Sequence, residues 1–148
     1  MVFISFARKK EANIQSILTQ TFSKSERLIA KTHIERLFKE PAGSFFIYPL
    51  KFTWIHCPLD EAVPAQILIT VSKKHFKRAH DRNRIKRQLR EVYRKNKSIA
   101  YDCLTSGGQQ ACFLLSYVGK EHSLTAALEK KVILLLKKFA DAMAQNNA

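Results

Sequence analysis

The hydrophobic and polar positions of this chain follow two different periods, and the change between them marks out the predicted elements. In residues 45–56 and 66–72, aromatic and β-branched residues predominate, as is typical of strands. Residues 111–118 (ACFLLSYV) form a continuous apolar run, which is typical of a buried strand. In residues 82–97 and after residue 123, apolar positions recur every three or four residues, which predicts amphipathic helices.

A short helix is predicted to precede the first strand. Thr32 and Glu35 have the spacing of a capping box, in which a hydroxyl and a carboxylate satisfy free amides at a helix start. Pro41 and Gly43 are expected to end this helix. Its apolar residues are predicted to be buried: Ile34, Leu37 and Phe38. The predicted element order is therefore α-β-β-α-β-α.

The first strand, residues 45–56, is predicted to be continuous, with successive side chains pointing to opposite faces. Pro49 cannot donate a backbone hydrogen bond, so the strand is expected to lie at an edge of the sheet there. One face is predicted to carry Phe46, Tyr48, Leu50, Phe52 and Trp54, and the other Phe45, Ile47, Lys51, Thr53 and Ile55. Phe46 and Trp54 are assigned to the core, whereas the hydroxyl of Tyr48 favours a boundary with water.

The final helix is predicted to have Ser123 as its N-cap. Its buried face is predicted to hold Leu124, Leu128, Val132, Leu135, Leu136, Phe139 and Met143. These elements predict an α+β fold, a compact sandwich of a small central sheet of about three strands with helices packed on it. Residues 22–148 are expected to form this single domain, and residues 1–21, which lack a clean period, are expected to be a flexible N-terminal extension.

Charge changes the picture of the second helix. The chain of 148 residues has a formal net charge of +14, and residues 73–97 hold twelve of its 26 Lys and Arg residues against two acids. This segment alone therefore contributes +10, and the remaining 14 bases and 10 acids contribute +4. Apolar residues are interleaved with the bases at helical spacing, so we expect the helix to be ordered against a core. These apolar residues are Ile85, Leu89, Val92 and Tyr93.

The polar residues of this helix separate into two arcs around its axis. One arc contains several cations and no acid: Arg82, Lys86, Lys97, Arg90, Asn83, Arg94 and Arg87. The other arc, which is expected to face water, contains Arg84, Gln88, Glu91 and Lys95. Neighbouring like charges weaken an isolated helix, whereas phosphates would neutralise them, so a polyanion is the expected partner. A basic helix that is merely solvated is the alternative.

Other kinds of chemistry have little support in the sequence. No apolar run is long enough to cross a bilayer. Cys57, Cys103 and Cys112 lack metal-ligand spacing and are expected to be reduced thiols of a cytoplasmic protein. The acids are scattered, the histidines have no zinc spacing, and a glycine-rich phosphate loop is missing. We therefore expect no catalytic residue and no metal ligand in the protein, no membrane partner and no obligate protein partner.

The segment VSKKHFKRAHDRNRIKRQLREVYR, residues 71–94, resembles the RNR motif of the bacterial ribonuclease P protein subunit. The resemblance extends from about Phe22 to Ala140 and includes Glu26-Arg27-Leu28 and Tyr48-Pro49-Leu50. It implies a compact sandwich similar to the second domain of ribosomal protein S5, in which the basic helix belongs to a left-handed β-α-β crossover. The resemblance also implies a function in transfer RNA maturation, as the protein subunit of an endoribonuclease.

In this family the catalytic RNA, with Mg²⁺ bound mainly by that RNA, removes the 5′ leader of precursor tRNA. The resemblance implies that the basic helix faces the catalytic RNA through Arg82, Asn83, Arg84, Lys86, Arg87 and Arg90. Lys73, Lys74 and Arg94, near the two ends of the same segment, are further candidates for RNA binding. The resemblance also implies that Phe38 and Tyr48 line a cleft that binds the single-stranded leader.

Two other classes of function remain open from the residues themselves. A general basic RNA-binding protein, either a ribosomal protein or an RNA chaperone without a catalytic partner, would carry a similar charge. A DNA-binding protein would need a helix that presents base-reading side chains, and usually a dimer surface. The sequence contains neither a helix-turn-helix pair nor a heptad seam, which disfavours the DNA-binding alternative.

Overall fold

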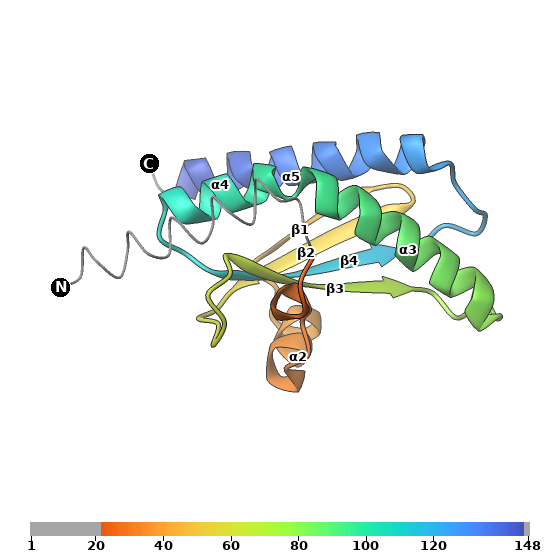
Figure 1. Ribbon diagram of the computed structural model, residues 1–148, viewed down its shortest axis with the longest axis horizontal. Coiled ribbons are helices and arrows are strands. Elements are labelled where there is room, and N and C mark those ends of the chain that lie inside the picture. Colours follow the sequence, from red (N-terminus) through yellow and green to blue (C-terminus); the bar gives the residue numbers. More distant parts are fainter. Residues whose placement is uncertain (1–21, 147–148) are drawn as a thin grey trace.

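The computed structural model of the protein describes residues 22–146, so the predicted extension at residues 1–21 lies outside the described part. The secondary-structure elements, in chain order, are η1 (Lys24–Glu26), α2 (Lys31–Lys39), β1 (Gly43–Ile47), β2 (Leu50–His56), β3 (Ala65–Val71), α3 (Ala79–Asn96), α4 (Ser98–Ser106), β4 (Ala111–Tyr117) and α5 (Thr125–Asn146). Figure 1 shows these elements as a layered α+β fold, which confirms the predicted fold class.

Within the described residues, the strands form one mixed four-stranded sheet in the order β1-β2-β4-β3. β2 pairs antiparallel with both β1 and β4, whereas β3 and β4 are parallel. A parallel pair needs a long crossover connection, and here α3 and α4 provide it. The basic helix is therefore part of the predicted β-α-β unit, directly after an edge strand.

Helices cover the two faces of the sheet unequally. Figure 1 shows α3, α4 and α5 together on one face and α2 alone on the other. Phe139 of α5 packs against two rings of the sheet. Its ring centroid lies 5.9 Å from that of Phe52 and 5.0 Å from that of Phe113. β4 alternates between the two faces, with Phe113 in the core under α5 and Leu114 in the core under α2. Both faces of β4 are buried, which explains its continuous apolar run.

The prediction of one continuous strand over residues 45–56 is wrong, because the segment is a hairpin. β1 ends at Ile47, β2 begins at Leu50, and these two residues are paired across the turn. Tyr48 and Pro49 form the turn, where the missing amide of Pro49 interrupts no ladder. The sheet consequently has one strand more than the sequence predicted.

Helix α4 was not predicted. It begins at Ser98, two residues after the end of α3, and its buried side consists of Ala100, Tyr101 and Leu104. Serine and threonine in the segment weaken the helical signal, because serine favours caps and turns and threonine loses side-chain freedom in a helix. Their hydroxyls instead bond within the helix, with Thr105 Oγ1 donating to the carbonyl of Tyr101 over 2.7 Å.

Two predicted helix starts are corrected by the structure. α2 begins at Lys31 with Ala30 as its N-cap, so Thr32 does not cap it. The capping-box geometry occurs earlier, where the amide of Ser23 donates to Glu26 Oε2 over 2.7 Å. At the other end of the chain, α5 begins at Thr125, so Ser123 is not its N-cap. Leu124 precedes the helix and is 79% exposed rather than buried. The rest of the predicted apolar face of α5 is buried: Leu128, Val132, Leu135, Leu136, Phe139 and Met143.

A buried ion pair joins the N-terminal segment to the junction between α3 and α4. Lys97 donates to Glu26 Oε1, and the hydroxyl of Tyr101 donates to the same oxygen over 2.8 Å. Glu26 and Lys97 are only 2% and 1% exposed, so neither charge is screened by water. The prediction that Lys97 belongs to the cationic arc is therefore wrong, because its charge is used inside the fold.

Candidate nucleic-acid interface

Helix α3 is anchored by the apolar stripe that the sequence predicted. Ile85, Leu89, Val92 and Tyr93 are at most 1% exposed, and the helix contacts β3 and α5. Because this stripe occupies one side of the helix, the intervening bases must lie on the others. The fold thus determines which cations of α3 reach water.

The side of α3 that faces α5 is identified by Gln88. Its Nε2 donates to the carbonyl of Ser123 over 3.2 Å and to Thr125 Oγ1 over 3.1 Å, at the start of α5. Lys86 and Arg90 are each two residues from Gln88, which places them about 200° away around the helix. These two cations therefore lie on the flank of α3 that points away from α5.

Most of the predicted RNA-binding residues are accessible and have no internal partner. Lys73, Lys74, Asn83, Arg84, Arg87 and Arg90 are exposed, and Lys86 is half-buried. Within residues 22–146, none of these side chains forms an ion pair or a hydrogen bond. We call this set, on α3 and the turn before it, the cationic surface. Unpaired cations at this density favour an anionic partner, because each bound phosphate releases counterions.

Arg82, another predicted RNA-binding residue, also stabilises the turn before α3. Its Nη1 donates to the carbonyls of Phe76 and Lys77, in both cases over 2.8 Å. These bonds hold the turn that leads into α3. The neighbouring residue Asp81 makes a separate contact, in which its carboxylate lies 3.5 Å from Nε2 of His122. Arg82 thus fixes the path of the chain at the start of the cationic surface.

Arg94 differs from the other predicted RNA-binding residues, because an acid of the same helix partly neutralises it. Its Nη2 lies 2.6 Å from Glu91 Oε1, and its Nε donates to Glu91 Oε2 over 3.1 Å. The hydrogen bond from Arg94 lowers the pKa of Glu91, and the charges of Arg94 and Lys95 add to the effect. The predicted contact of Glu91 with Lys95 is present but longer, at 3.9 Å.

A second accessible surface is aromatic and is carried by α2 and the β1–β2 hairpin. Phe38 is 65% exposed, Phe46 is 59% exposed and Tyr48 is 58% exposed. We call these three residues the aromatic surface. Their exposed faces are available for stacking, and the face of an aromatic ring suits the face of a nucleic-acid base. Phe38 and Tyr48 were candidates for leader binding, and the burial of Phe38 predicted from helical spacing is wrong.

The exposure of Phe46 was not predicted, because a continuous strand put this residue in the core with Trp54. In the hairpin register Phe46 is opposite Lys51, whereas Phe45 is opposite Phe52. Phe45 therefore packs against Trp54, with ring centroids 5.2 Å apart, and Phe46 points to the other face. Trp54 itself is only 6% exposed, as predicted. The Tyr48-Pro49 dipeptide was the sequence signal that could have revealed the turn.

The fold and these two surfaces define a class of protein: a small basic α+β domain with a cationic helix and exposed aromatic rings, typical of RNA-binding domains. Residues 22–140 match the family model described as Ribonuclease P. The chain therefore belongs to the ribonuclease P protein family, and its function is that of a protein component of ribonuclease P. The matched residues agree with the extent of the resemblance that the sequence indicated.

Individual relatives support the same assignment. The ribonuclease P protein component of Porphyromonas gingivalis is 35% identical over 115 residues, covering 75% of this chain and 83% of the relative. That of Pasteurella multocida is 41% identical over 73 residues, covering 49% of this chain and 58% of the relative.

Solved structures show the same fold at lower identity. The RNase P protein from Thermotoga maritima matches with a TM-score of 0.60 and 23% identity, over 76% of this chain and 96% of that one. The RNase P protein of Staphylococcus aureus matches with a TM-score of 0.59 and 22% identity, over 77% of this chain and 94% of that one. Among residues 22–146, none of the helices has both the length and the apolar character needed to cross a membrane.

Proposed function

We propose that this protein binds the ribonuclease P RNA through the cationic surface and holds the 5′ leader of precursor tRNA on the aromatic surface. The RNA subunit, with bound Mg²⁺, hydrolyses the phosphodiester bond at the mature 5′ end. The protein contributes no catalytic group to this reaction. The holoenzyme acts in the cytoplasm on precursor tRNA.

The exposure of the cationic surface is the observation that carries this proposal. Arg84, Arg87 and Arg90 are exposed on a helix whose opposite side is fully buried, so the helix cannot turn its charges away. Their planar guanidinium groups suit phosphate oxygens, which they can contact with two parallel hydrogen bonds. Neutralising backbone phosphates near the catalytic RNA would also lower its demand for Mg²⁺.

The aromatic surface suits a single strand of variable sequence. A base stacked on Phe or Tyr gains about 1–3 kcal/mol whatever its identity, because each base has a π-face. An enzyme that must process every precursor tRNA benefits from a contact that tolerates any leader sequence. Stacking on Phe46 or Tyr48 would therefore favour precursor over mature tRNA and assist product release.

The proposal is tested by cleavage of precursor tRNA by the cognate RNA subunit at low Mg²⁺, with and without the full-length protein. We expect the protein to raise the cleavage rate or the affinity for precursor, with all cuts at the mature 5′ end. The double variant Arg87→Gln/Arg90→Gln should lose most of this gain. A matched control, Lys130→Gln/Lys137→Gln, removes the same charge from exposed positions of α5 and should keep it.

Two results would overturn the proposal. One is no gain at any Mg²⁺ concentration together with equally tight binding to unrelated RNAs, which would indicate a general basic RNA-binding protein. The other is an equal loss in the α3 and α5 double variants, which would show that total charge matters and that the cationic surface does not.

A further inference from the structure

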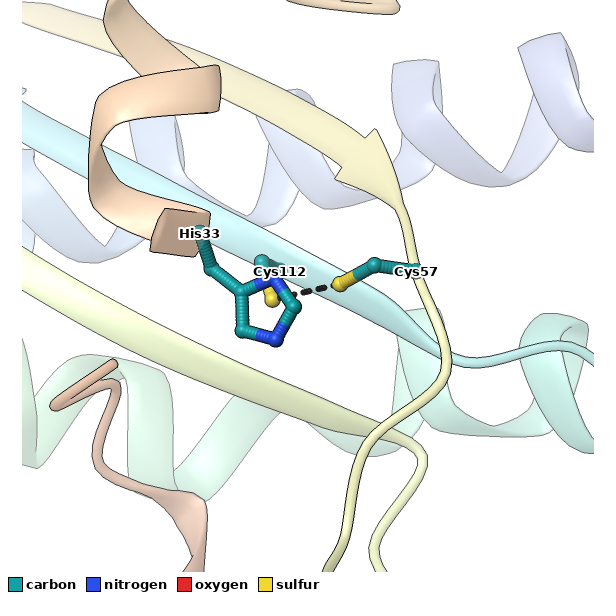
Figure 2. Close-up of side chains that lie close together, drawn as sticks. All are labelled: His33, Cys57 and Cys112. Carbon is teal, nitrogen blue, oxygen red and sulfur yellow. Dashed lines mark hydrogen bonds between the residues drawn. The ribbon is translucent and has the colours of Figure 1, made fainter. Parts of the chain in front are cut away.

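A cluster of metal-ligating side chains lies away from both proposed RNA-contacting surfaces. The ligand atoms of His33, Cys57 and Cys112 all lie within 4.8 Å of one another, although the residues are far apart in the sequence. Figure 2 shows the imidazole of His33, at the start of α2, facing the two sulfur atoms. The sulfur atoms are 2.9 Å apart, whereas a disulfide bond is about 2.05 Å long, so both thiols are free.

The fold brings these residues together through strand register. Cys112 is the second residue of β4 and is opposite Ile55, and Cys57 directly follows the last residue of β2. Because side chains alternate along a strand, Ile55, Cys57 and Cys112 share the face covered by α2. Leu37, one helical turn beyond His33, packs into the same cluster and holds the start of α2 over the thiols.

His33 has an unexplained polar atom in this cluster. Its Nδ1 is buried, and within the described residues it has no hydrogen-bond partner. An unpaired buried nitrogen costs free energy that folding normally avoids, and a bound ion is one partner that removes this cost. A cation bound between this nitrogen and the two sulfur atoms would supply that partner.

We propose that His33, Cys57 and Cys112 form a binding site for Zn²⁺. Two cysteine sulfurs and one imidazole nitrogen are ligands that this borderline-soft ion prefers, and three protein ligands leave a fourth position for water. Zn²⁺ binds the neutral imidazole through the lone pair of Nδ1, with the proton on Nε2. The two thiols lose one proton each to solvent, so the two thiolates balance the charge of the ion.

The required rearrangement is small. With Zn–S bonds of about 2.3 Å in tetrahedral geometry, two thiolates lie about 3.8 Å apart, so the sulfur atoms must separate by about 1 Å. A small shift of Cys57 can provide this, because the residue lies just beyond β2 and, among residues 22–146, its amide makes one backbone hydrogen bond, to the carbonyl of Gln110. His33 is half-buried, which leaves a route for water to the fourth position.

Bound Zn²⁺ would join the start of α2 to two strands of the sheet. The same helix carries Phe38 near its other end, and the cluster under α2 is much smaller than the core under α5. The metal would therefore stabilise the thinner side of the molecule. Binding to the folded state alone would raise the unfolding temperature with increasing Zn²⁺.

The site is tested with the full-length chain, made without a histidine tag and kept reduced with a phosphine rather than a thiol. Co²⁺ serves as a coloured substitute for Zn²⁺. We expect one equivalent of Co²⁺ to give thiolate-to-metal charge-transfer absorption and the visible bands of tetrahedral coordination. Zn²⁺ should displace the Co²⁺, and its affinity is measured against a chromophoric chelator.

Variants assign the ligands. Cys57→Ser and Cys112→Ser should each lower Zn²⁺ affinity by at least about 100-fold, more than the loss of an outer hydrogen-bond partner. His33→Gln, at a half-buried position on the first turn of α2, should fold normally and lower Zn²⁺ affinity by at least about tenfold. Two controls should bind as the wild type does: Cys103→Ser, whose thiol contacts the carbonyl of Ala140, and His56→Gln, whose side chain alternates to the other face.

Three results would overturn the proposal. The first is Co²⁺ binding without thiolate charge transfer in the reduced wild type. The second is unchanged Zn²⁺ affinity in His33→Gln and in both cysteine variants. The third is a single free thiol in denatured chain that was purified without any reductant, which would identify Cys57 and Cys112 as a disulfide. These results do not involve RNA, so they are independent of the proposed function.

Discussion

The two faces of the sheet differ in how completely they are covered. α3, α4 and α5 bury one face in a large core that contains the rings of Phe52, Phe113 and Phe139. α2 covers only part of the other face, over a small cluster around Leu37 and Ile55, and Phe46 is left in water. Both faces nevertheless belong to the same four strands, and β4 contributes to the core on each side.

This difference explains why the two proposed contact surfaces have different chemistry. A helix that carries mutually repelling cations needs a deep core on its other side, and α3 has one. An exposed aromatic ring needs neighbours that leave it uncovered, and the short helix α2 provides that. Charge is therefore presented from the thickly covered face, and stacking rings from the thinly covered one.

The two largest effects are expected for buried groups of the thickly covered face, and one of them is the buried ion pair. Glu26→Ala should lower the free energy of unfolding by about 3–5 kcal/mol, because the Lys97 ammonium is left buried without its counter-charge. Urea denaturation measures this change. The double variant Glu26→Leu/Lys97→Met should lose much less, because it buries no charge at all. A single variant that matches the double one would show that the pair is not a coupled buried charge.

Truncation of one leucine in each core compares the faces directly. Leu89→Ala, under α3, should cost about 4–5 kcal/mol, near the upper limit for such changes, since the surrounding core cannot collapse into the cavity. Leu37→Ala, under α2, should cost about 2–3 kcal/mol, because a thin layer relaxes more easily. Equal losses of stability in urea denaturation would contradict the distinction between a thick and a thin cover.

On the thinly covered face, Tyr48→Ala and Phe46→Ala should each reduce the preference for precursor over mature tRNA. The loss should be about 1–3 kcal/mol where a base stacks on the ring, while affinity for the RNA subunit stays unchanged. Leu134→Ala, at an exposed apolar position on α5, is the matched control and should have no effect. Binding of both tRNAs to the assembled holoenzyme measures the preference, and an equal loss for the two would make these rings structural.

The smallest effect is expected for one cation of the cationic surface. Arg90→Ala should weaken binding to the RNA subunit and reduce the slope of log affinity against log salt by about one. Protein stability should not change, because Arg90 is exposed and has no ion pair within the described residues. Lys95→Ala, on the arc next to Glu91, should leave the slope nearly unchanged. If Lys95 and Arg90 contribute equally, the binding surface includes both polar arcs of the helix.

The second helix and its buried stripe could be predicted because both depend on local periodicity. Ile85, Leu89, Val92 and Tyr93 repeat at helical spacing, and burying them leaves the bases on the remaining sides. The strand β4 could also be predicted from a local pattern, because a strand buried on both faces is a continuous apolar run. The RNR motif then made the family recognisable from residues 71–94 alone.

The hairpin, α4 and the use of Lys97 were not predictable in this way. One turn at Tyr48-Pro49 changes the face of Phe46, so a local error in the turn moved an exposed ring into the predicted core. Lys97 continues the basic pattern of α3, and only the distant carboxylate of Glu26 shows that this lysine is internal. The sequence spacing of His33, Cys57 and Cys112 likewise contains no sign that they meet.

The sequence by itself determined the period of each main helix, the concentration of charge on residues 73–97 and the family to which the chain belongs. The reason is that periodicity, charge and motif spacing are properties of neighbouring residues. Only the tertiary structure decided which cations are free, which aromatic rings are exposed and which thiols meet a histidine. Those outcomes depend on strand register and on the packing of residues far apart in the chain, where one residue of shift reverses the face of a side chain.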